Sequence, residues 1–195
     1  MKKGDEKRVT FRRFAQRIRV PAGFVLAPLL FISARPTAAT LAAGAFVAVI
    51  GLAIRAWASG HVRKNEELAT SGPYAHTRNP LYLGTFLLGV GVAVGGGALW
   101  FVALFAVFYL MIYVPVMLAE AETMRSLFPA DYEEYGKQVP LFAPRFTPYR
   151  ARSTRSNSGR QFDVSLYLQH REYRAAFGFL AVYALLAAKL AMAVG

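Results

Sequence analysis

The feature that most constrains this chain is a long uncharged stretch in its middle. Residues 79–119 contain no Asp, Glu, Lys or Arg. As a helix at about 1.5 Å per residue, the stretch would be roughly 60 Å long, which is about two crossings of a ~30 Å hydrocarbon core. Gly95, Gly96 and Gly97 lie near its midpoint and mark a turn. The stretch therefore predicts a tight helical hairpin in a membrane, with helices over residues 80–95 and 98–118.

Composition agrees with a membrane protein and excludes several kinds of site. Hydrophobic residues make up 55% of the chain, whereas soluble domains usually have about 45–50%. There is no Cys, which excludes disulfides, thiolate metal sites and a Cys nucleophile. The three His residues are too scattered to indicate a metal site. The net charge is +12. The basic residues flank apolar spans, as the positive-inside rule expects, so we expect no nucleic-acid partner.

Three further apolar stretches extend the prediction to an all-α, polytopic membrane protein with about five transmembrane helices. Residues 36–54 are long enough to cross a bilayer. Residues 20–34 are short for a crossing. They either pair with 36–54 as a first hairpin over residues 20–54 or form a re-entrant or interfacial segment. Residues 175–195 predict a C-terminal transmembrane helix, in which Lys189 can extend its ammonium to the interface.

The basic residues predict the orientation of these spans. Segments 1–19, 56–79 and 119–174 fall on one side and hold every Lys and Arg except Arg35, Arg55 and Lys189. By the positive-inside rule this side is cytoplasmic. The Ala-, Gly- and Arg-rich composition indicates a bacterial inner membrane protein. We expect a basic cytoplasmic N-terminus, a first hairpin, a core, a basic linker and a final helix over residues 1–19, 20–54, 55–148, 149–174 and 175–195, respectively.

Two polar clusters flank the central hairpin, and the hairpin brings them to the same membrane face. The first includes "GPYAHTRNPLYLG", in which Asn79 and Pro80 predict a helix start, with Asn at the N-cap and Pro at the first helical position. The second is "EAETMRSLFPADYEEYGKQVPLFAP", whose "ADYEEYGKQV" predicts a short amphipathic helix. Arg78 and Glu120 stand at the two ends of the hairpin, so we expect them at the same depth, where they could form one site.

In this order and spacing, the two clusters resemble the isoprenylcysteine carboxyl methyltransferase family and the related phospholipid methyltransferases over about residues 55–148. The family pattern is a Gly-Pro-Tyr turn, Arg-His-Pro-x-Tyr-x-Gly, two apolar spans, then Glu-Glu, Phe-Gly, two spaced Tyr and Val-Pro-x-Phe. The resemblance implies an integral membrane enzyme with a cytoplasmic cofactor pocket. Such an enzyme would transfer a methyl group from S-adenosylmethionine, leaving S-adenosylhomocysteine, to a lipophilic or lipidated acceptor that arrives from the bilayer.

The resemblance also implies the residues of the site. The implied catalytic residues are Arg78, suited to a carboxylate, and Glu120, suited to an amino group or a ribose hydroxyl. No metal ligand is implied. The implied cofactor-binding residues are Gly72, Pro73, Tyr74, His76, Asn79, Pro80, Tyr82, Gly84, Glu120 and Glu122.

The chain departs from the family pattern at three places, one of which is Phe128-Pro129, where the family has Phe-Gly. Asn79 stands where the family often has His, and an amide cannot take a proton near neutral pH. Ala121 replaces the second Glu, and Glu122 points about 100° away from it on a helix. His76 also allows a second interpretation, as an exposed loop residue.

Other functions remain open alternatives. The first is a non-enzymatic small membrane protein, such as a transporter or an assembly factor. Transporters typically show inverted repeats and charges inside their spans, whereas this chain shows no internal repeat and its charges stand at the ends of spans. The second is an enzyme similar to the sterol reductases that use NADPH, which requires a dinucleotide pocket and usually a longer chain. The acceptor, and whether an O, N or S atom is methylated, stays open.

Overall fold

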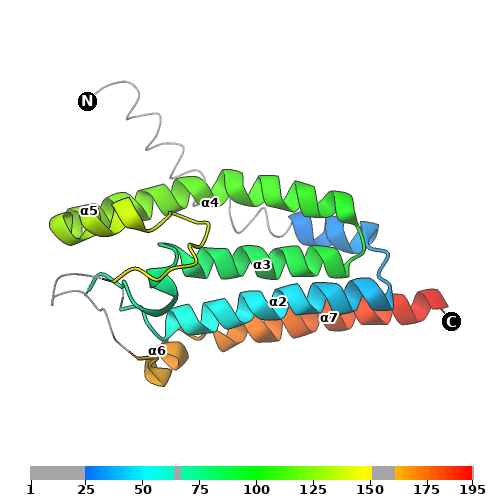
Figure 1. Ribbon diagram of the computed structural model, residues 1–195. Coiled ribbons are helices and arrows are strands. Elements are labelled where there is room, and N and C mark those ends of the chain that lie inside the picture. The colour runs from blue at the N-terminus through cyan, green and yellow to red at the C-terminus, as the bar shows by residue number, and fades with distance from the viewer. Residues whose placement is uncertain (1–24, 64–66, 151–160, 195) are drawn as a thin grey trace.

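The computed structural model describes residues 25–63, 67–150 and 161–194, and the regular elements within these ranges are helices, with no strand among them. The long helices lie roughly alongside one another, with α3 between α4 on one side and α2 and α7 on the other (Figure 1). The all-α fold class is therefore confirmed. The long helices are α2 (Ala38–Ser59), α3 (Pro80–Gly95), α4 (Leu99–Leu127) and α7 (Tyr173–Val194). The short elements are η1 (Gly72–Ala75), α5 (Pro129–Gln138) and α6 (Val164–Gln169).

Helices α3 and α4 form the predicted central hairpin. Its turn contains Gly97 at φ +72°, a conformation that glycine adopts without the steric cost of a Cβ. The backbone N–H of Arg35 donates to the Gly96 carbonyl oxygen at 2.8 Å and joins this turn to the segment before α2. Helix α4 has 29 residues and is thus about 43 Å long. Because this exceeds the hydrocarbon thickness, its last turns, with Glu120, extend beyond the apolar layer.

Glycines allow α2 and α3 to pack backbone against backbone. A Cβ added to Gly44 would lie 2.3 Å from the carbonyl oxygen of Gly91, and one added to Gly51 would lie 2.5 Å from that of Gly84. Small residues of this kind support close helix packing in membranes. Helix α7 packs on the same pair of helices, and the Tyr183 hydroxyl donates to the Gly91 carbonyl oxygen at 3.1 Å. The predicted C-terminal helix is therefore an integral part of the helix bundle.

The chain is an integral membrane protein, because α2, α4 and α7 are each long and apolar enough to cross a bilayer. Helix α3 is apolar but has 16 residues, or about 24 Å, and is the shorter arm of the hairpin. Residues 25–33 are helical, while the remainder of the predicted first segment up to residue 24 lies outside the described residues. The count of five spans therefore stays a prediction.

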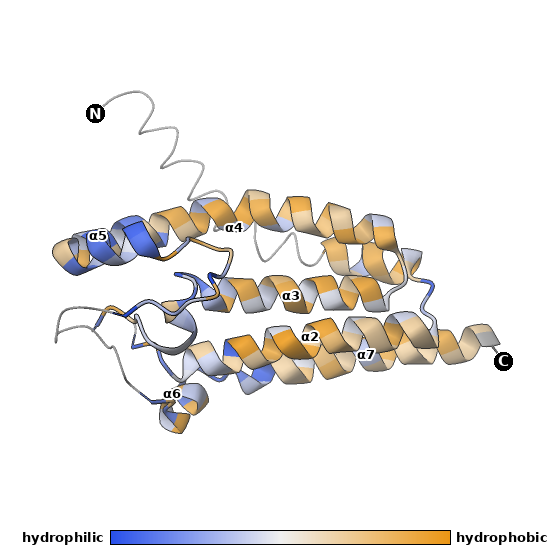
Figure 2. Ribbon diagram, in the orientation of Figure 1, coloured by the Kyte–Doolittle hydropathy of each residue, from blue (hydrophilic) through white to orange (hydrophobic). Residues whose placement is uncertain are grey.

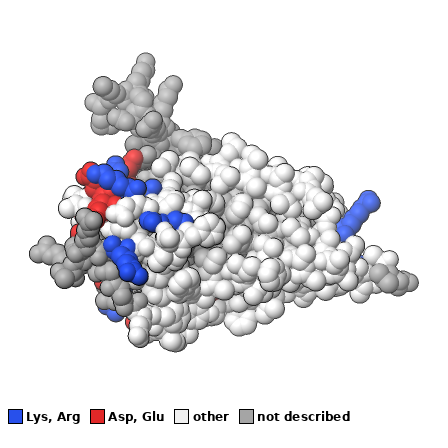
Figure 3. Space-filling model, viewed as in Figure 1, with Lys and Arg blue, Asp and Glu red and all other residues white. Residues whose placement is uncertain are grey.

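Polar and charged residues gather at one end of the helix bundle. Figure 2 shows apolar helices along the length of the molecule and hydrophilic residues around α5, α6 and the loops beside them. Figure 3 shows the charged side chains on this face of the molecule at the same end, apart from an isolated basic patch at the opposite end. The expected basic N-terminus, residues 1–19, lies outside the described residues.

Two boundaries differ from the sequence-based expectation. Helix α2 begins after a capping box between Thr37 and Thr40 and continues to Ser59, so Arg55 lies within the helix instead of ending a span at residue 54. Helix α6 forms inside the expected linker 149–174, because the Asp163 side chain accepts a hydrogen bond from the backbone N–H of Ser165 at 2.8 Å and caps it. Residues 151–160 of that linker lie outside the described residues.

Candidate active site

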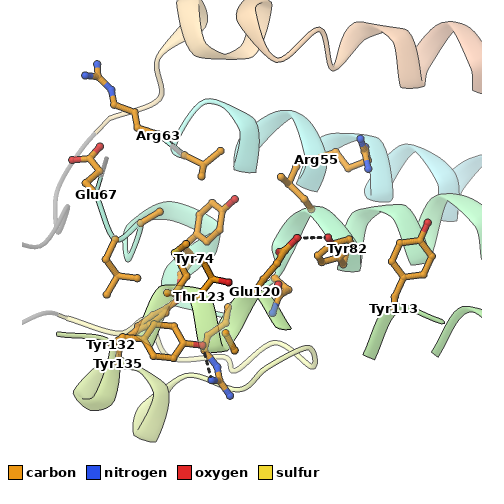
Figure 4. Close-up of a pocket in the computed structure, with 18 of the residues that line it drawn as sticks. Arg55, Arg63, Glu67, Tyr74, Tyr82, Tyr113, Glu120, Thr123, Tyr132 and Tyr135 are labelled. Atoms are coloured by element: carbon orange, nitrogen blue, oxygen red, sulfur yellow. Dashed lines mark hydrogen bonds between the residues drawn. The ribbon is translucent and has the colours of Figure 1, made fainter. Parts of the chain in front are cut away.

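A cavity of about 640 Å³ lies at the polar end of the helix bundle. Its volume is within the range of about 300–1,000 Å³ that is usual for small-molecule sites. Figure 4 shows side chains of several elements directed toward it. It is lined by residues of α2, α3 and α4, of the segment leading into η1, of α5 and of the segment before α7. Both predicted polar clusters therefore contribute to one cavity.

The Gly-Pro-Tyr turn of the first cluster is the helix η1. Gly72 has φ +56°, and a Cβ at this position would lie 2.6 Å from the imidazole ring of His61. Only glycine therefore fits the turn without strain. Tyr74 follows Pro73 and lines the cavity, whereas Gly72 and Pro73 shape the turn from outside the lining. Burial raises the pKa of the Tyr74 phenol well above its ordinary value, and the negative charges of Glu120 and Glu172 raise it further, so Tyr74 is a protonated donor at neutral pH.

Arg78 lies two residues before the start of α3. It is held there by contacts with α5 and with the tail that follows α5. One of its Nη atoms donates to the Tyr132 hydroxyl at 3.1 Å, and its guanidinium lies 5.9 Å from the centroid of the same ring. Its backbone N–H donates to the Pro140 carbonyl oxygen at 3.0 Å. No described carboxylate forms an ion pair with Arg78. Arg78 therefore presents a positive charge in the cavity that a ligand anion can neutralise.

Tyr82 and Glu120 join the two clusters directly. The Tyr82 hydroxyl donates to Glu120 Oε1 at 2.6 Å (dashed line in Figure 4), and both side chains line the cavity. The Tyr82 ring lies 5.4 Å from that of Tyr113, and the Tyr109 hydroxyl donates to the Tyr82 carbonyl oxygen at 2.7 Å. The hairpin thus brings residues 38 positions apart into hydrogen-bond contact, at the shared depth that the sequence predicts.

Asn79 and His76 attach the C-terminal tail of the core to the first cluster. Asn79 occupies the N-cap position of α3 as predicted, but its side chain makes no capping hydrogen bond. Instead its Nδ2 donates to the Leu141 carbonyl oxygen at 2.8 Å. The His76 Nδ1 lies 2.8 Å from the Arg145 carbonyl oxygen, so His76 is half-buried and does not line the cavity. These contacts hold residues 139–150 against η1 and α3.

The structure brings five of the eleven predicted site residues to the cavity surface and leaves six outside it. The cavity is lined by Tyr74, Arg78, Asn79, Tyr82 and Glu120. Gly84 packs against the Gly51 carbonyl oxygen, so its role is to allow α2 and α3 to pack closely. Glu122 is exposed on α4, consistent with its offset from Glu120 around the helix. The predicted residues outside the lining are Gly72, Pro73, His76, Pro80, Gly84 and Glu122. The ligand contacts of all these residues stay predictions.

Sequence reasoning did not select several polar residues that the cavity contains. Arg55 donates through one Nη to Glu172 Oε2 at 2.6 Å and through the other to the Thr85 hydroxyl. Arg55 could have been found, because a lone charge within an apolar helix is itself a functional signal. Glu172 could not, because its partner lies 117 positions away. Tyr113 was not selected, because the apolar span that contains it has several other aromatic residues.

The aromatic residues of α5 also line the cavity. Tyr132 and Tyr135 face the core of this end of the molecule with Val139, as the amphipathic pattern predicts. The Tyr135 hydroxyl donates to the Tyr74 carbonyl oxygen at 2.7 Å, and burial raises the pKa of this phenol well above its ordinary value. Tyr135 therefore fixes the position of η1 in addition to covering the cavity.

Comparisons with known proteins find one family and two curated relatives that resemble this chain. The sequence profile described as phospholipid methyltransferase matches residues 37–131. The cobalt-zinc-cadmium resistance protein CzcN of Cupriavidus metallidurans is 36% identical over 146 residues, which span 70% of this chain and 66% of that protein. The nickel-cobalt-cadmium resistance protein NccN of Alcaligenes xylosoxydans xylosoxydans is 30% identical over 120 residues, which span 60% of this chain and 56% of that protein.

The chain thus matches somewhat less than two thirds of the length of either relative. No solved structure matches it. The profile match covers α2, η1, α3, α4 and the start of α5, and so contains Arg78, Tyr82 and Glu120 with the hairpin that joins them. The resemblance seen in the motifs is therefore confirmed: residues 37–131, a little under half of the chain, match the phospholipid methyltransferase family.

Proposed function

We propose that this protein is an S-adenosylmethionine-dependent methyltransferase that acts at the cytoplasmic face of a bacterial inner membrane. The match of residues 37–131 to the phospholipid methyltransferase family supports methyl transfer, and the three long apolar helices support a membrane enzyme. The observation that carries the proposal is the composition of one cavity. It combines an arginine without an ionic partner among the described residues, Arg78, with the carboxylate of Glu120 and several tyrosine rings.

The residues of the cavity fit the proposed cofactor. S-adenosylmethionine has an amino-acid end with a carboxylate and an ammonium group, a sulfonium and an adenosine. Arg78 would hold the carboxylate, and Glu120 would accept from the ammonium group or from a ribose hydroxyl. Tyr74 and Tyr132 offer aromatic faces for adenine or for a cation. When bound, the cofactor supplies an electrophilic methyl group.

The contribution of the protein is to position the reactants and exclude water. Methyl transfer is an in-line displacement, for which holding donor and acceptor in the right geometry supplies much of the rate enhancement. Tyr82 restrains the Glu120 carboxylate through its 2.6 Å hydrogen bond. Asn79 and Thr77 donate hydrogen bonds to the backbone of the tail over residues 139–150 and so anchor that tail beside the start of α3.

The acceptor is a lipophilic molecule in this proposal, either a lipid headgroup or a carboxylate similar to that of isoprenylcysteine. The polar cavity lies at the ends of apolar helices, so an amphiphile can reach it without leaving the bilayer. An amine or a thiol would have to lose a proton before reacting, and Glu120 is the carboxylate best placed to accept one. A carboxylate acceptor is already nucleophilic and needs no base.

The names of the relatives point to a physiological setting. They are called resistance proteins toward cobalt, zinc, cadmium and nickel. We extend to this chain the proposal that methylation of a membrane component supports tolerance of such metals. Deletion of the gene is expected to lower the cobalt or cadmium concentration that stops growth, with restoration by the wild-type gene and not by the Glu120→Ala variant. Equal restoration by both would contradict a catalytic contribution.

The proposed activity is tested by transfer of a labelled methyl group. The purified protein in nanodiscs is incubated with methyl-labelled S-adenosylmethionine and a lipid extract of the host, and the organic phase is separated by chromatography. The proposal expects a labelled lipid with the wild-type protein and none with Glu120→Ala. Label that stays with the cofactor, in protein that binds S-adenosylhomocysteine, would contradict a lipid acceptor.

A further inference from the structure

The C-terminal unit formed by α6 and α7 lies outside the family-matched residues and yet reaches the cavity. It is attached at both ends and in the middle. The backbone N–H of Asp163 donates to the Gly60 carbonyl oxygen at 3.0 Å. The Tyr183 hydroxyl donates to Gly91, and the Lys189 ammonium donates to the carbonyl oxygens of Phe31 and Ile32. Glu172 directly precedes α7, so its position is restrained by the contacts of Asp163, Tyr183 and Lys189.

Glu172 neutralises Arg55 at the membrane-side end of the cavity. The two side chains form an ion pair at 2.6 Å, with only 21% of the Arg55 side chain and 14% of the Glu172 side chain exposed. About 6 Å of helix separates Arg55 from the end of α2 at Ser59, and its second partner, Thr85, lies within α3. An ion pair in this environment is screened less by solvent than one on the surface.

The remaining charges of the cavity have a different distribution. Arg63 is close to Asp163, at 3.8 Å in a largely solvated position. Arg78 has no described carboxylate partner, and Glu120 has no described basic partner. Glu67, the remaining carboxylate in the lining, already takes part in an interaction of its own. Arg78 and Glu120 are therefore the cation and the anion that match the two charges of a bound amino acid. If Arg78 and Glu120 bind the amino-acid end of the cofactor, the positive charge at the membrane-side end of the cavity is that of Arg55. Glu172 already neutralises this charge.

We propose that Glu172 is a specificity-determining residue that makes the membrane-side end of the cavity accept an uncharged acceptor group and reject an anionic one. An anion entering beside Arg55 would meet the negative charge of Glu172 at short range, and such like-charge contacts suppress unsuitable ligands. The acceptor class is therefore an amphiphile whose reacting group is a neutral amine, hydroxyl or thiol. This inference rests on the proposed function, although its test does not require methyl transfer.

The test compares two single-chain amphiphiles that differ in charge. Palmitate, kept ionised at alkaline pH, and hexadecanol are added in equal amounts to the detergent-purified protein, and native mass spectrometry measures how much of each is bound. The wild-type protein is expected to bind hexadecanol in preference to palmitate. In Glu172→Gln the ratio of bound palmitate to bound hexadecanol should rise by about tenfold, because Arg55 loses its counter-charge while the side-chain shape is kept.

A second variant separates charge from damage to the fold. The double variant Arg55→Gln/Glu172→Gln again has no net charge at this position, so its ratio should return to within about twofold of the wild-type value. Arg55→Gln alone leaves Glu172 unpaired and should lower the ratio below the wild-type value. A preference of the wild-type protein for palmitate, or a ratio that does not change in Glu172→Gln and in Arg55→Gln, would overturn the proposal.

The same samples are titrated with S-adenosylhomocysteine to keep the two proposals distinguishable. Normal cofactor binding with an unchanged amphiphile ratio would overturn only the role of Glu172. A shifted amphiphile ratio in protein that binds no S-adenosylhomocysteine would contradict the proposed methyltransferase, while the charge selectivity of the cavity would stand.

Discussion

The two ends of the helix bundle are held together in different ways. At the end that contains the α3–α4 turn, three hydrogen bonds between different segments end on backbone carbonyl oxygens: Arg35 N–H donates to Gly96, the Thr40 hydroxyl to Gly95, and the Lys189 ammonium to Phe31. The cavity end also has hydrogen bonds to backbone carbonyl oxygens, but there polar side chains of different elements contact one another as well: Tyr82 donates to Glu120, Arg78 to Tyr132, and Arg55 to Glu172.

This difference indicates that the turn end mainly stabilises the fold, whereas the cavity end carries the polar side chains available to ligands. A contact with a backbone carbonyl oxygen requires only that the chain passes at the right place, and many sequences can supply the carbonyl. A contact between two polar side chains requires both residue types and costs desolvation when it is brought out of water. The turn end therefore depends on glycine and close packing, whereas the cavity end contains the polar residues that could bind and orient ligands. Substitutions at the two ends should affect different measurements.

The largest expected effect is loss of ligand binding in Arg78→Ala. This variant removes the cation without a described carboxylate partner from the cavity, and truncation of a charged hydrogen-bonding partner typically costs 2–5 kcal/mol. We expect binding of S-adenosylhomocysteine to weaken by roughly 100-fold, as measured by calorimetry, with unchanged helix content by circular dichroism. Arg125→Ala is the matched control, because Arg125 is exposed on α4 outside the cavity lining. Equal loss in both variants would remove Arg78 from the site.

The next effect concerns stability at the opposite end. Gly97 has φ +72°, and a Cβ there would lie 2.3 Å from the Arg35 carbonyl oxygen. Gly97→Ala should therefore lower the free energy of unfolding by about 2 kcal/mol or more, seen as a lower melting temperature in the same detergent. Binding of S-adenosylhomocysteine by the folded fraction should not change. In contrast, Gly178→Ala should not destabilise the protein, because nothing lies within 4 Å of a Cβ at Gly178.

A smaller effect is expected from the hydroxyl that joins the clusters. Tyr82→Phe keeps the ring contact with Tyr113 but removes the 2.6 Å hydrogen bond to Glu120. Because this bond is solvent-exposed, its loss should weaken binding of S-adenosylhomocysteine by about threefold to tenfold, with little change in melting temperature. Tyr167→Phe on α6 removes a hydroxyl outside the cavity lining and serves as control. A change in melting temperature without a change in binding would place Tyr82 with the structural contacts.

The smallest effect is a pH-dependent one at the cap of α6. Hydrogen bonds from the Ser165 hydroxyl and backbone N–H hold the pKa of Asp163 below its ordinary value of 3.8. The folded pKa is lower than the unfolded one, so the stabilisation is present above the unfolded value and disappears as pH falls through the folded value. Asp163→Ala should lower the melting temperature slightly at neutral pH, and the difference from wild type should vanish in strong acid. A difference that persists there would assign the effect to packing.

Much of the fold could be predicted from the sequence because its signals are local. The uncharged stretch and the three glycines predict α3, α4 and their turn, and the spacing of Tyr132, Tyr135 and Val139 predicts the buried face of α5. Pro80 is the first residue of α3, as predicted, because its fixed φ suits a helix and its missing N–H is not needed in the first turn.

The remainder depends on tertiary contacts that leave no local pattern. The side chain of Asn79 was expected to cap α3, but it bonds instead to a tail 62 positions later. The pairing of Arg55 with Glu172 requires α2 and α7 to be neighbours, which the glycines of α2 and the hydroxyl of Tyr183 decide. The turn at Gly72 and the start of α3, which depend on neighbouring residues, were therefore predicted. The Arg55–Glu172 pair at the membrane-side end of the cavity was not.

The most direct test of the proposed function is calorimetric titration of the purified protein in nanodiscs with S-adenosylmethionine and with S-adenosylhomocysteine. If the cavity is a methyltransferase site, both ligands should bind with saturation at one site per chain, and Glu120→Ala should abolish or strongly weaken both. The absence of binding by wild-type protein with full helix content, also after addition of host lipids, would contradict the proposed cofactor and favour a non-enzymatic role.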